Sequence, residues 1–391
     1  MTRQDSAAPV PAPWSTQTVP YALRDGDGTG PQGTAVPRGR ARDRRGWRHP
    51  GTDLAAAVAT GARDWRRDTV RPAPGSGWRR ALYLVSGKAL NPGQSPAEVA
   101  ARALDRRLRT AIESDFRIGF VQLKGGSGKT TTTMGVGNAF AACRSEGVLA
   151  FDVNPDRGNL ARRTSARSEA SALTLLAGPR PRRVHDVRAH TQLTPAGLEI
   201  LASAADPATA DSFAAHDYRQ LLELAGDYFS LMLADCGTGI THPATQAVLA
   251  EADALVIPLD AKKDSADEAV ATVEYLYHAY AKDPVTGAPL LDERGERRWL
   301  YRSLLSRAVV VISHQHPGRR MFDTTAATHW FNQWVHAVRE IPYDRHLDEG
   351  GAIDPQLLHP RTRQAYRELA AALAGLFPLK YSPTSGLRPA G

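Results

Sequence analysis

Cysteine is scarce in this sequence of 391 residues, which contains only Cys143 and Cys236. The two stand far apart, match no metal-ligand spacing and cannot form the disulfide framework typical of small secreted domains. No run of 18 or more apolar residues is present, so we expect no membrane span, and the first residues lack the apolar segment of a signal peptide. These absences favour a reducing compartment, and we expect a cytoplasmic protein.

The first 80 residues contain no lysine and no glutamate, but they contain fourteen arginines and seven aspartates. This segment therefore carries +7 of the net charge of +8. Proline- and glycine-rich segments such as PVPAPW and RPAPGSG interrupt any longer helix or strand. We therefore expect a disordered arm over residues 1–76, with one candidate helix over Asp53–Trp65. Six arginines lie within residues 38–48, around Trp47. They predict nonspecific binding to DNA or to an anionic surface, although a solvated basic tail explains them equally well.

The stretch from Arg117 to Arg144 combines a predicted strand, a glycine-rich turn and a helix. We expect the strand over Ile118–Leu123, the turn over Lys124–Gly128 and the helix after it. A turn without Cβ atoms can aim several backbone N–H groups at one point, and the following helix adds its positive dipole end. This pattern is typical of a site for a nucleoside triphosphate.

Side chains of the same stretch complete the predicted site. Lys129 supplies a charge for the outer phosphates, and the Thr130 hydroxyl is placed to ligate Mg2+. Further nucleotide contacts are expected from the rest of the turn and the start of the helix, namely Gly125, Gly126, Ser127, Gly128 and Thr131.

The turn departs from the general phosphate-loop pattern, because Leu123 stands where that pattern has its first glycine. KGGSGKTT, which begins with Lys124, resembles the deviant phosphate loop of the ParA/MinD ATPases. The resemblance implies ATP and Mg2+ as cofactors, slow hydrolysis and an ATP-dependent homodimer. It also implies that Lys124 reaches across the dimer interface to the partner's nucleotide.

Two further segments resemble the switch regions of that family. In FDVNPD, Asp152 matches the first aspartate of the first switch, which the resemblance places near the Mg2+ waters or the phosphate-loop lysine. Asn154 stands where the family has the aspartate that positions the attacking water, and an amide orients a water without taking its proton. In LADCGTG, Asp235 caps a predicted strand and is expected to hold Mg2+ through water.

Strands alternate with helices over residues 116–377, which predicts an α/β fold with a doubly wound, mostly parallel sheet covered on both faces. The expected domains are the disordered arm (1–76), a helical lead-in (77–115), a P-loop ATPase domain (116–377) and a flexible tail (378–391). Further strands are expected over Val148–Asp152, Leu198–Leu201, Tyr228–Ala234, Ala254–Pro258, Ala308–Ser313 and Val338–Ile341, and helices over Thr130–Arg144, Phe213–Gly226, Ser265–Ala281, Phe322–His336 and Arg361–Phe377.

The lead-in contains the capping box Ser95-Pro-Ala-Glu98, which predicts a helix that runs to about Glu113. One face of this helix is apolar and should dock on the domain that follows; its residues are Val99, Ala103, Leu104 and Leu108. The segments GWRR, SPAE and EIPYDRHLDEGGAID resemble the corresponding segments of actinobacterial MinD-like proteins associated with type VII secretion.

Two segments are expected to lie near the nucleotide base, and one of them departs from the family pattern. Ser313 ends a predicted strand where the family often has an asparagine for adenine, so this motif does not establish adenine specificity. Pro342, in the segment IPYD, matches the residue that flanks the base in the family.

Three biological roles fit these patterns. The first is an accessory ATPase of a secretion apparatus that acts through a protein partner. The second is a partition ATPase that binds DNA nonspecifically; its candidate contacts are Arg162, Arg163, Arg180, Arg182 and Arg183. The default expectation for these five residues is that they are solvated loop arginines. The third is a nucleotide-binding scaffold with little turnover, which Asn154 in the first switch would explain.

Overall fold

The computed structural model describes residues 71–153, 158–164, 170–202, 214–318 and 322–378. The chain separates into two compact units, Met1–Thr69 and Val70–Gly391, and all described residues belong to the second. Almost all of the predicted arm, its candidate helix, Asn154 and nearly all of the predicted tail lie outside the described residues.

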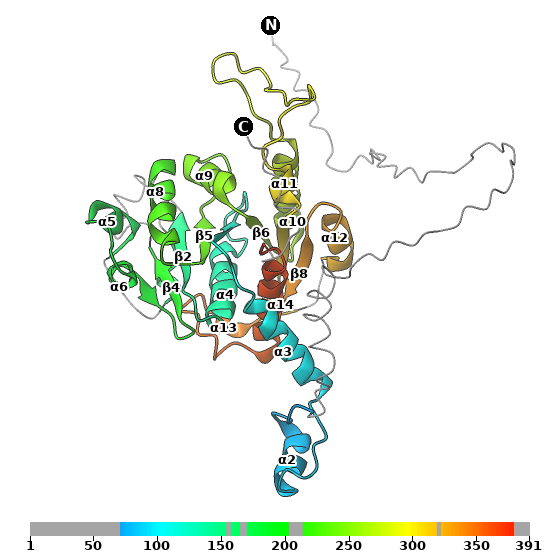
Figure 1. The fold of residues 1–391 in the computed structure, drawn as a ribbon. Coiled ribbons are helices and arrows are strands. Elements are labelled where there is room, and N and C mark those ends of the chain that lie inside the picture. The colour runs from blue at the N-terminus through cyan, green and yellow to red at the C-terminus, as the bar shows by residue number, and fades with distance from the viewer. Residues whose placement is uncertain (1–70, 154–157, 165–169, 203–213, 319–321, 379–391) are drawn as a thin grey trace, which may run out of the picture. The chain divides into compact units, whose positions relative to one another are not determined.

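Eight strands form one sheet in the order β3-β4-β2-β5-β1-β6-β7-β8 (Figure 1). All neighbouring strands are parallel except β3 and β4, which confirms the predicted mostly parallel sheet. The strands are β1 (Phe116–Phe120), β2 (Val148–Val153), β3 (Gln192–Leu193), β4 (Leu198–Leu201), β5 (Leu231–Cys236), β6 (Ala254–Asp260), β7 (Ala308–Ser313) and β8 (Ala337–Ile341).

The central strands are mostly apolar because both faces of the sheet are covered; the aspartates of β2 and β5 lie at their carboxyl ends. In β2, for example, Leu149 and Phe151 point into one hydrophobic core, and Val148 and Ala150 point into the other. The sequence therefore shows continuous apolar runs rather than an alternation of apolar and polar residues. The fold is a doubly wound α/β sheet, as predicted.

Each face of the sheet has its own set of helices, assigned from the core to which they contribute buried side chains. One face is covered by α3 (Pro96–Leu108), α4 (Lys129–Ala141) and α14 (Pro360–Ala374). The other face is covered by α5 (Ala172–Ala177), α6 (Val184–Arg188), α8 (Ala215–Gly226), α9 (Pro243–Glu251), α10 (Lys263–His278), α11 (Arg302–Leu305) and α12 (Thr324–Phe331). The remaining helices are α2 (Gly77–Val85), the 3-10 turn η1 (Ala161–Arg163) and α13 (Arg345–Asp348).

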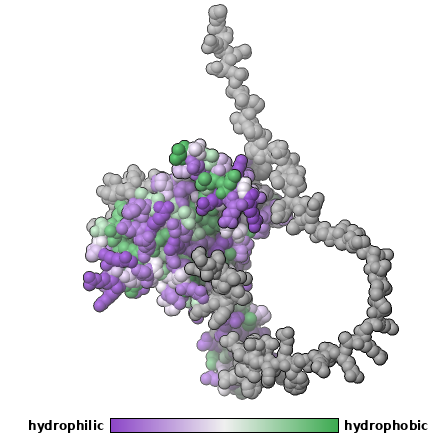
Figure 2. All heavy atoms as spheres, turned by 45° about the horizontal axis from the view of Figure 1, so that its top comes forward, coloured by the Kyte–Doolittle hydropathy of each residue, from purple (hydrophilic) through white to green (hydrophobic). Residues whose placement is uncertain are grey.

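The outer surface contrasts with these two cores. On the face shown in Figure 2, the described residues are mostly hydrophilic, and the hydrophobic ones lie in separate small patches. Among the described residues, no helix has both the length and the apolar character that crossing a bilayer requires.

Helices α4 and α14 approach each other closely at Gly135. A Cβ atom built on Gly135 would lie 2.2 Å from Cε1 of Tyr366, so the aromatic ring rests directly on the helix backbone. Tyr366 is 3% exposed, and burial raises the pKa of its hydroxyl. Only a glycine at position 135 leaves room for this ring.

Several predicted boundaries are corrected by tertiary packing. The capping box of Ser95 and Glu98 is confirmed, but α3 ends at Leu108, and Val99 is 52% exposed rather than part of the docked face. The predicted helix 322–336 stops at Phe331 and continues as a turn, in which Trp334 packs against Trp330 and Tyr277.

Residues 282–300 are polar and contain two turn signals, which predict a surface hairpin or loop, and the structure confirms an exposed segment there between α10 and α11. Isolated antiparallel bridges join Tyr280 to Trp299, Lys282 to Pro289 and Leu291 to Arg297.

Replacing Gly135 with alanine should lower the free energy of unfolding by about 1–3 kcal/mol, because the new methyl group displaces the Tyr366 ring from a packed core. Urea unfolding followed by circular dichroism measures this change. Gly351→Ala is the matched control, since nothing lies within 4 Å of a Cβ there. Equal midpoints for the two variants would contradict the close packing of α4 and α14.

Candidate functional site

The phosphate loop lies between the end of β1 and the start of α4. Gly126 and Gly128 have φ angles of 75° and 87°, a region that residues with a side chain rarely adopt. Gly128 is also the N-cap of α4, so the loop turns directly into the first helical turn. The backbone N–H groups at the start of α4 have no partners within the helix and are available to an anion.

Lys129 lies inside this loop and is 8% exposed. Its Nζ donates to the backbone carbonyl oxygens of Lys124 at 3.2 Å and of Gln122 at 3.5 Å. Burial lowers the pKa of Lys129, while the charge of Asp235 acts in the opposite direction. The ammonium group is thus hydrogen-bonded to two neutral carbonyl groups, and a phosphate in the cavity would add a negative charge beside it.

Ser127 gives an independent sign that the loop binds a ligand. Its side chain is 2% exposed, and its Oγ atom has no hydrogen-bond partner among the described residues. Ser127 lines a cavity of about 400 Å3, together with the six residues around it, Gly125, Gly126, Gly128, Lys129, Thr130 and Thr131. A buried hydroxyl without a partner costs about 1–3 kcal/mol, and a phosphate oxygen would remove this cost. The loop therefore fits a polyphosphate.

The side of the loop toward β5 fits a divalent cation. Burial raises the pKa of the Asp235 carboxyl, and hydrogen bonds from the Thr130 and Thr133 hydroxyl groups act against this rise. Asp235 does not line the cavity, whereas Thr130 does. This arrangement would let Thr130 contact Mg2+ directly and Asp235 act through a water molecule, because Mg2+ favours oxygen ligands and keeps several waters.

Asp152 lies beside Asp235, because β2 and β5 pair these two residues directly. Its side chain is buried, and its Oδ2 accepts a hydrogen bond from the backbone N–H of Leu160 at 3.1 Å. A Cβ on Gly158 would clash with the same carboxylate. Asp152 thus organises the turn that follows β2 and does not line the cavity, and its predicted role toward Mg2+ or the loop lysine stays a prediction.

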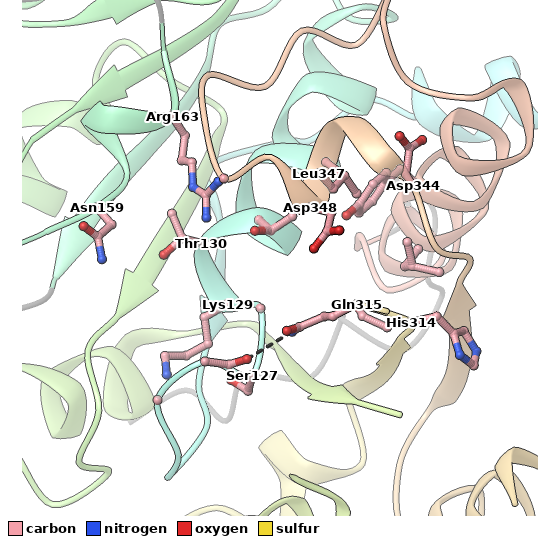
Figure 3. A pocket seen from close by; sticks show the side chains of 18 of the residues that line it. Ser127, Lys129, Thr130, Asn159, Arg163, His314, Gln315, Asp344, Leu347 and Asp348 are labelled. Atoms are coloured by element: carbon pink, nitrogen blue, oxygen red, sulfur yellow. Dashed lines mark hydrogen bonds between the residues drawn. The ribbon is translucent and has the colours of Figure 1, made fainter. Parts of the chain in front are cut away.

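The opposite wall of the cavity consists of the ends of β7 and β8. Ser313, His314, Gln315 and Pro342 all line it. Gln315 donates from Nε2 to the carbonyl oxygen of Gly126 at 3.0 Å, a bond drawn in Figure 3. No sequence pattern indicates a role for Gln315. Its side chain joins the phosphate loop to the wall on which a base would lie.

Asp344 fixes the segment after β8. Its two carboxylate oxygens accept hydrogen bonds from the backbone N–H groups of His346 at 3.0 Å and His359 at 2.8 Å. These bonds anchor the start of α13 and the residue that caps α14. Asp344 therefore positions this wall of the cavity, and Pro342, Leu347 and Asp348 line the cavity together with it.

Arg163 corrects the expectation of a solvated loop arginine. Its side chain is half-buried and points into the cavity toward Thr130 and Asp348 (Figure 3). Its Nη1 donates to the carbonyl oxygen of Gly351 at 3.4 Å, and its backbone carbonyl accepts from Ile353. Burial lowers the pKa of Arg163, and none of the ion pairs among the described residues includes it. A half-buried arginine of this kind is suited to binding a phosphate.

Lys124 differs from Lys129 in its surroundings. It does not line the cavity of its own chain, and its side chain is 39% exposed. Its Nζ donates to Oδ2 of Asp264, in the first turn of α10, at 2.5 Å. The hydrogen bond from Lys124 to this carboxylate raises the pKa of the lysine. Of the two lysines of the motif, only Lys129 lines the cavity.

The family model described as the CobQ/CobB/MinD/ParA nucleotide binding domain matches residues 118–350. The chain belongs to this family. The ESX-1 secretion-associated protein EspI of Mycobacterium tuberculosis (strain ATCC 25618 / H37Rv) is 32% identical over 303 residues. The alignment covers 77% of this chain and 42% of EspI, so the chain spans less than half the length of that relative.

Solved structures with a similar arrangement include the cell division ATPase MinD of Pyrococcus furiosus, at 17% identity and a TM-score of 0.48. This match covers 67% of the present chain and 99% of that protein. The ParA family ATPase of Chlorobium tepidum is 17% identical with a TM-score of 0.49, and the match covers 66% of this chain and 98% of that one. The resemblance to the ParA/MinD proteins and to their type VII secretion-associated members is confirmed by the family match and by EspI.

For this member of the family, Arg163→Ala should weaken nucleotide binding by at least about tenfold, because a hydrogen bond to a charged group contributes about 1.5–3 kcal/mol. Isothermal titration with ATP and with ADP measures the effect. A loss of affinity for both nucleotides would place Arg163 near the α- and β-phosphates, whereas a loss of affinity for ATP alone would place it near the γ-phosphate.

The control is Arg162→Ala, which removes the neighbouring, exposed arginine of the same 3-10 turn and should leave both affinities within about twofold. Equal affinities for the two variants and the unmodified protein would exclude Arg163 from the nucleotide site.

Proposed function

We propose that this protein is an ATP-dependent switch that binds ATP with Mg2+, forms a homodimer in the ATP state and hydrolyses ATP slowly. The observation that carries the proposal is the different placement of the two lysines. Lys129 is buried inside the loop that would hold the phosphates, whereas Lys124 does not line its own cavity, is partly exposed and pairs with Asp264 on α10. A lysine so placed is positioned to serve a second copy of the chain.

Within one chain, each group would have a separate task. The loop N–H groups, Lys129 and Ser127 would hold the phosphates, and Thr130 with Asp235 would hold Mg2+. When bound, the metal ion neutralises charge that develops on the transferred phosphoryl group. Pro342 and Gln315 would flank the base. The predicted water-positioning role of Asn154 is part of the proposal and rests on the sequence alone.

The 32% identity with EspI supports an accessory role in type VII secretion, through contacts with other proteins. The described arginines give less support to DNA binding. Arg180 pairs with Asp227 at 3.4 Å, and Arg163 lines the nucleotide cavity. ATP-dependent retention on DNA that falls steeply with salt would overturn this preference.

The experiment that tests the proposed switch is mass in solution with and without ATP-Mg2+, combined with phosphate release from the same sample. An ATP-dependent dimer with slow release supports the switch. A dimer without release would instead make the protein a nucleotide-binding scaffold. A monomer under both conditions would overturn the proposed mechanism.

Lys129→Ala should abolish micromolar binding of ATP, because it removes the buried ammonium group at the centre of the loop. Equilibrium titration with a fluorescent ATP analogue and competition by ATP measure this. Retained micromolar affinity would show that the nucleotide binds elsewhere.

Lys124→Ala should keep nucleotide binding but lose the ATP-dependent dimer and most of the turnover, since its ammonium group lies outside its own cavity. Sedimentation velocity and phosphate release measure the two effects. Lys263→Ala is the matched control, because this lysine is exposed and pairs with Asp267 on α10. An unchanged dimer fraction in the Lys124 variant would refute its action across an interface.

A further inference from the structure

A second cavity, of about 360 Å3, lies between α3, α4, α14 and the segment before α14. Tyr366 lines both this cavity and the nucleotide cavity, so the two cavities adjoin at this residue. The volume falls within the range of about 300–1,000 Å3 that is typical of small-molecule sites. None of the residues predicted from the sequence as site residues lines this second cavity.

The walls carry an excess of positive charge. Three arginines, Arg109, Arg363 and Arg367, line the cavity with a single carboxylate, that of Asp105. Asp105 forms an ion pair with Arg367, which leaves the charges of the other two arginines without a carboxylate partner among the described residues. The cavity therefore favours an anion.

Backbone carbonyl groups fix these two arginines in place. Nε of Arg109 donates to the carbonyl oxygen of Cys143 at 2.9 Å. Nη1 of Arg363 donates to the carbonyl oxygens of Pro355 at 3.3 Å and Gln356 at 2.9 Å. A guanidinium group has five N–H donors, so each arginine retains further donors after these contacts.

Two buried donors along the same walls have no partner. Asn138 is 3% exposed; its Oδ1 accepts from the Thr194 hydroxyl at 2.7 Å, and its Nδ2 has no hydrogen-bond partner among the described residues. The Nε atom of Arg367 is also buried without a partner. An unsatisfied buried donor costs about 1–3 kcal/mol, and a ligand with acceptor oxygens would remove this cost.

The rest of the lining is apolar and compact; it includes Ala139, Ala142, Ile353, Pro355 and Leu358. Such walls favour a small apolar body that extends from the charged group. The chain's own first 80 residues are an unsuitable occupant, because they carry a net charge of +7 with fourteen arginines.

We propose that this cavity binds a small organic anion, with a carboxylate or phosphate group held by Arg109, Arg363 and Asn138 and an apolar body against α4 and the 353–358 segment. The site is separate from the proposed nucleotide site and does not depend on ATP binding for its existence.

Cys143 provides a reporter within the cavity, because its thiol is half-buried and lines the wall. Iodoacetate and iodoacetamide are alkylating probes of nearly equal size that differ in charge. With either probe, the thiolate forms an S–C bond and iodide leaves. Peptide mapping by mass spectrometry reads Cys143 separately from Cys236.

Comparing the two probes cancels the effect of the thiol's own ionisation, which matters because burial raises the pKa of Cys143. We expect the rate ratio of iodoacetate to iodoacetamide at Cys143 to exceed that of N-acetylcysteine by about tenfold or more, equivalent to about 1.4 kcal/mol. Phenylacetate and phenyl phosphate should protect Cys143, and phenylacetamide should not. The relative protection by the two anions identifies carboxylate or phosphate as the preferred group.

Arg363→Met should remove both the rate preference and the protection, while Arg361→Met, an exposed neighbour on α14 that does not line the cavity, should keep them. Protection by the anions in the unmodified protein needs no variant and remains decisive if Arg363→Met does not fold.

A ratio equal to that of N-acetylcysteine would overturn the proposal. A rate preference without protection by either anion would also overturn it, since surface charge alone would then explain the preference. Neither result affects the proposed ATP switch, because the labelling is measured without nucleotide.

Discussion

The parallel register of the sheet is the constraint on which the site depends. Because β1, β2 and β5 run in the same direction, Phe120, Asp152 and Asp235 reach the same edge of the sheet in neighbouring positions. The phosphate loop leaves this edge directly after β1, and the ends of β7 and β8 meet on its other side. Ligands bind at this edge in doubly wound sheets because the loops after the strands diverge there.

Long-range hydrogen bonds then hold the cavity walls to one another. Gln315 joins the wall after β7 to the phosphate loop, and the backbone of Arg163 joins the turn after β2 to the segment near Ile353. Asp344 joins the end of β8 to the start of α14. The walls therefore come from segments far apart in the sequence, and each wall is positioned by at least one bond to another.

The sequence was sufficient for the features that depend on local pattern. The apolar strands, the capping box at Ser95 and the glycine-rich loop each have a short-range physical cause, and all three are present in the structure. Helix ends were less predictable: α12 ends at Phe331, and the contact of Trp334 with the distant Tyr277 is not visible in the local pattern.

Residues that act through the tertiary structure could not be predicted in the same way. Arg163 and Arg162 are adjacent and chemically identical, yet one lines a cavity and the other is exposed. Gln315 and Tyr366 likewise carry no local signal, since their positions follow from the packing of β7 and α14 against distant elements. Only the fold distinguishes such residues from ordinary surface or core positions.

The position of Tyr366 has a thermodynamic consequence for the two cavities that it lines. The ring rests on Gly135 and cannot move toward α4. A shift of the ring that enlarges one cavity therefore reduces the other. If molecules in the two cavities compete for that space, each must change the affinity of the other by the same factor, because linkage between equilibria is reciprocal. A single aromatic side chain would then convert the occupancy of one cavity into a bias on the other without any change in the sheet.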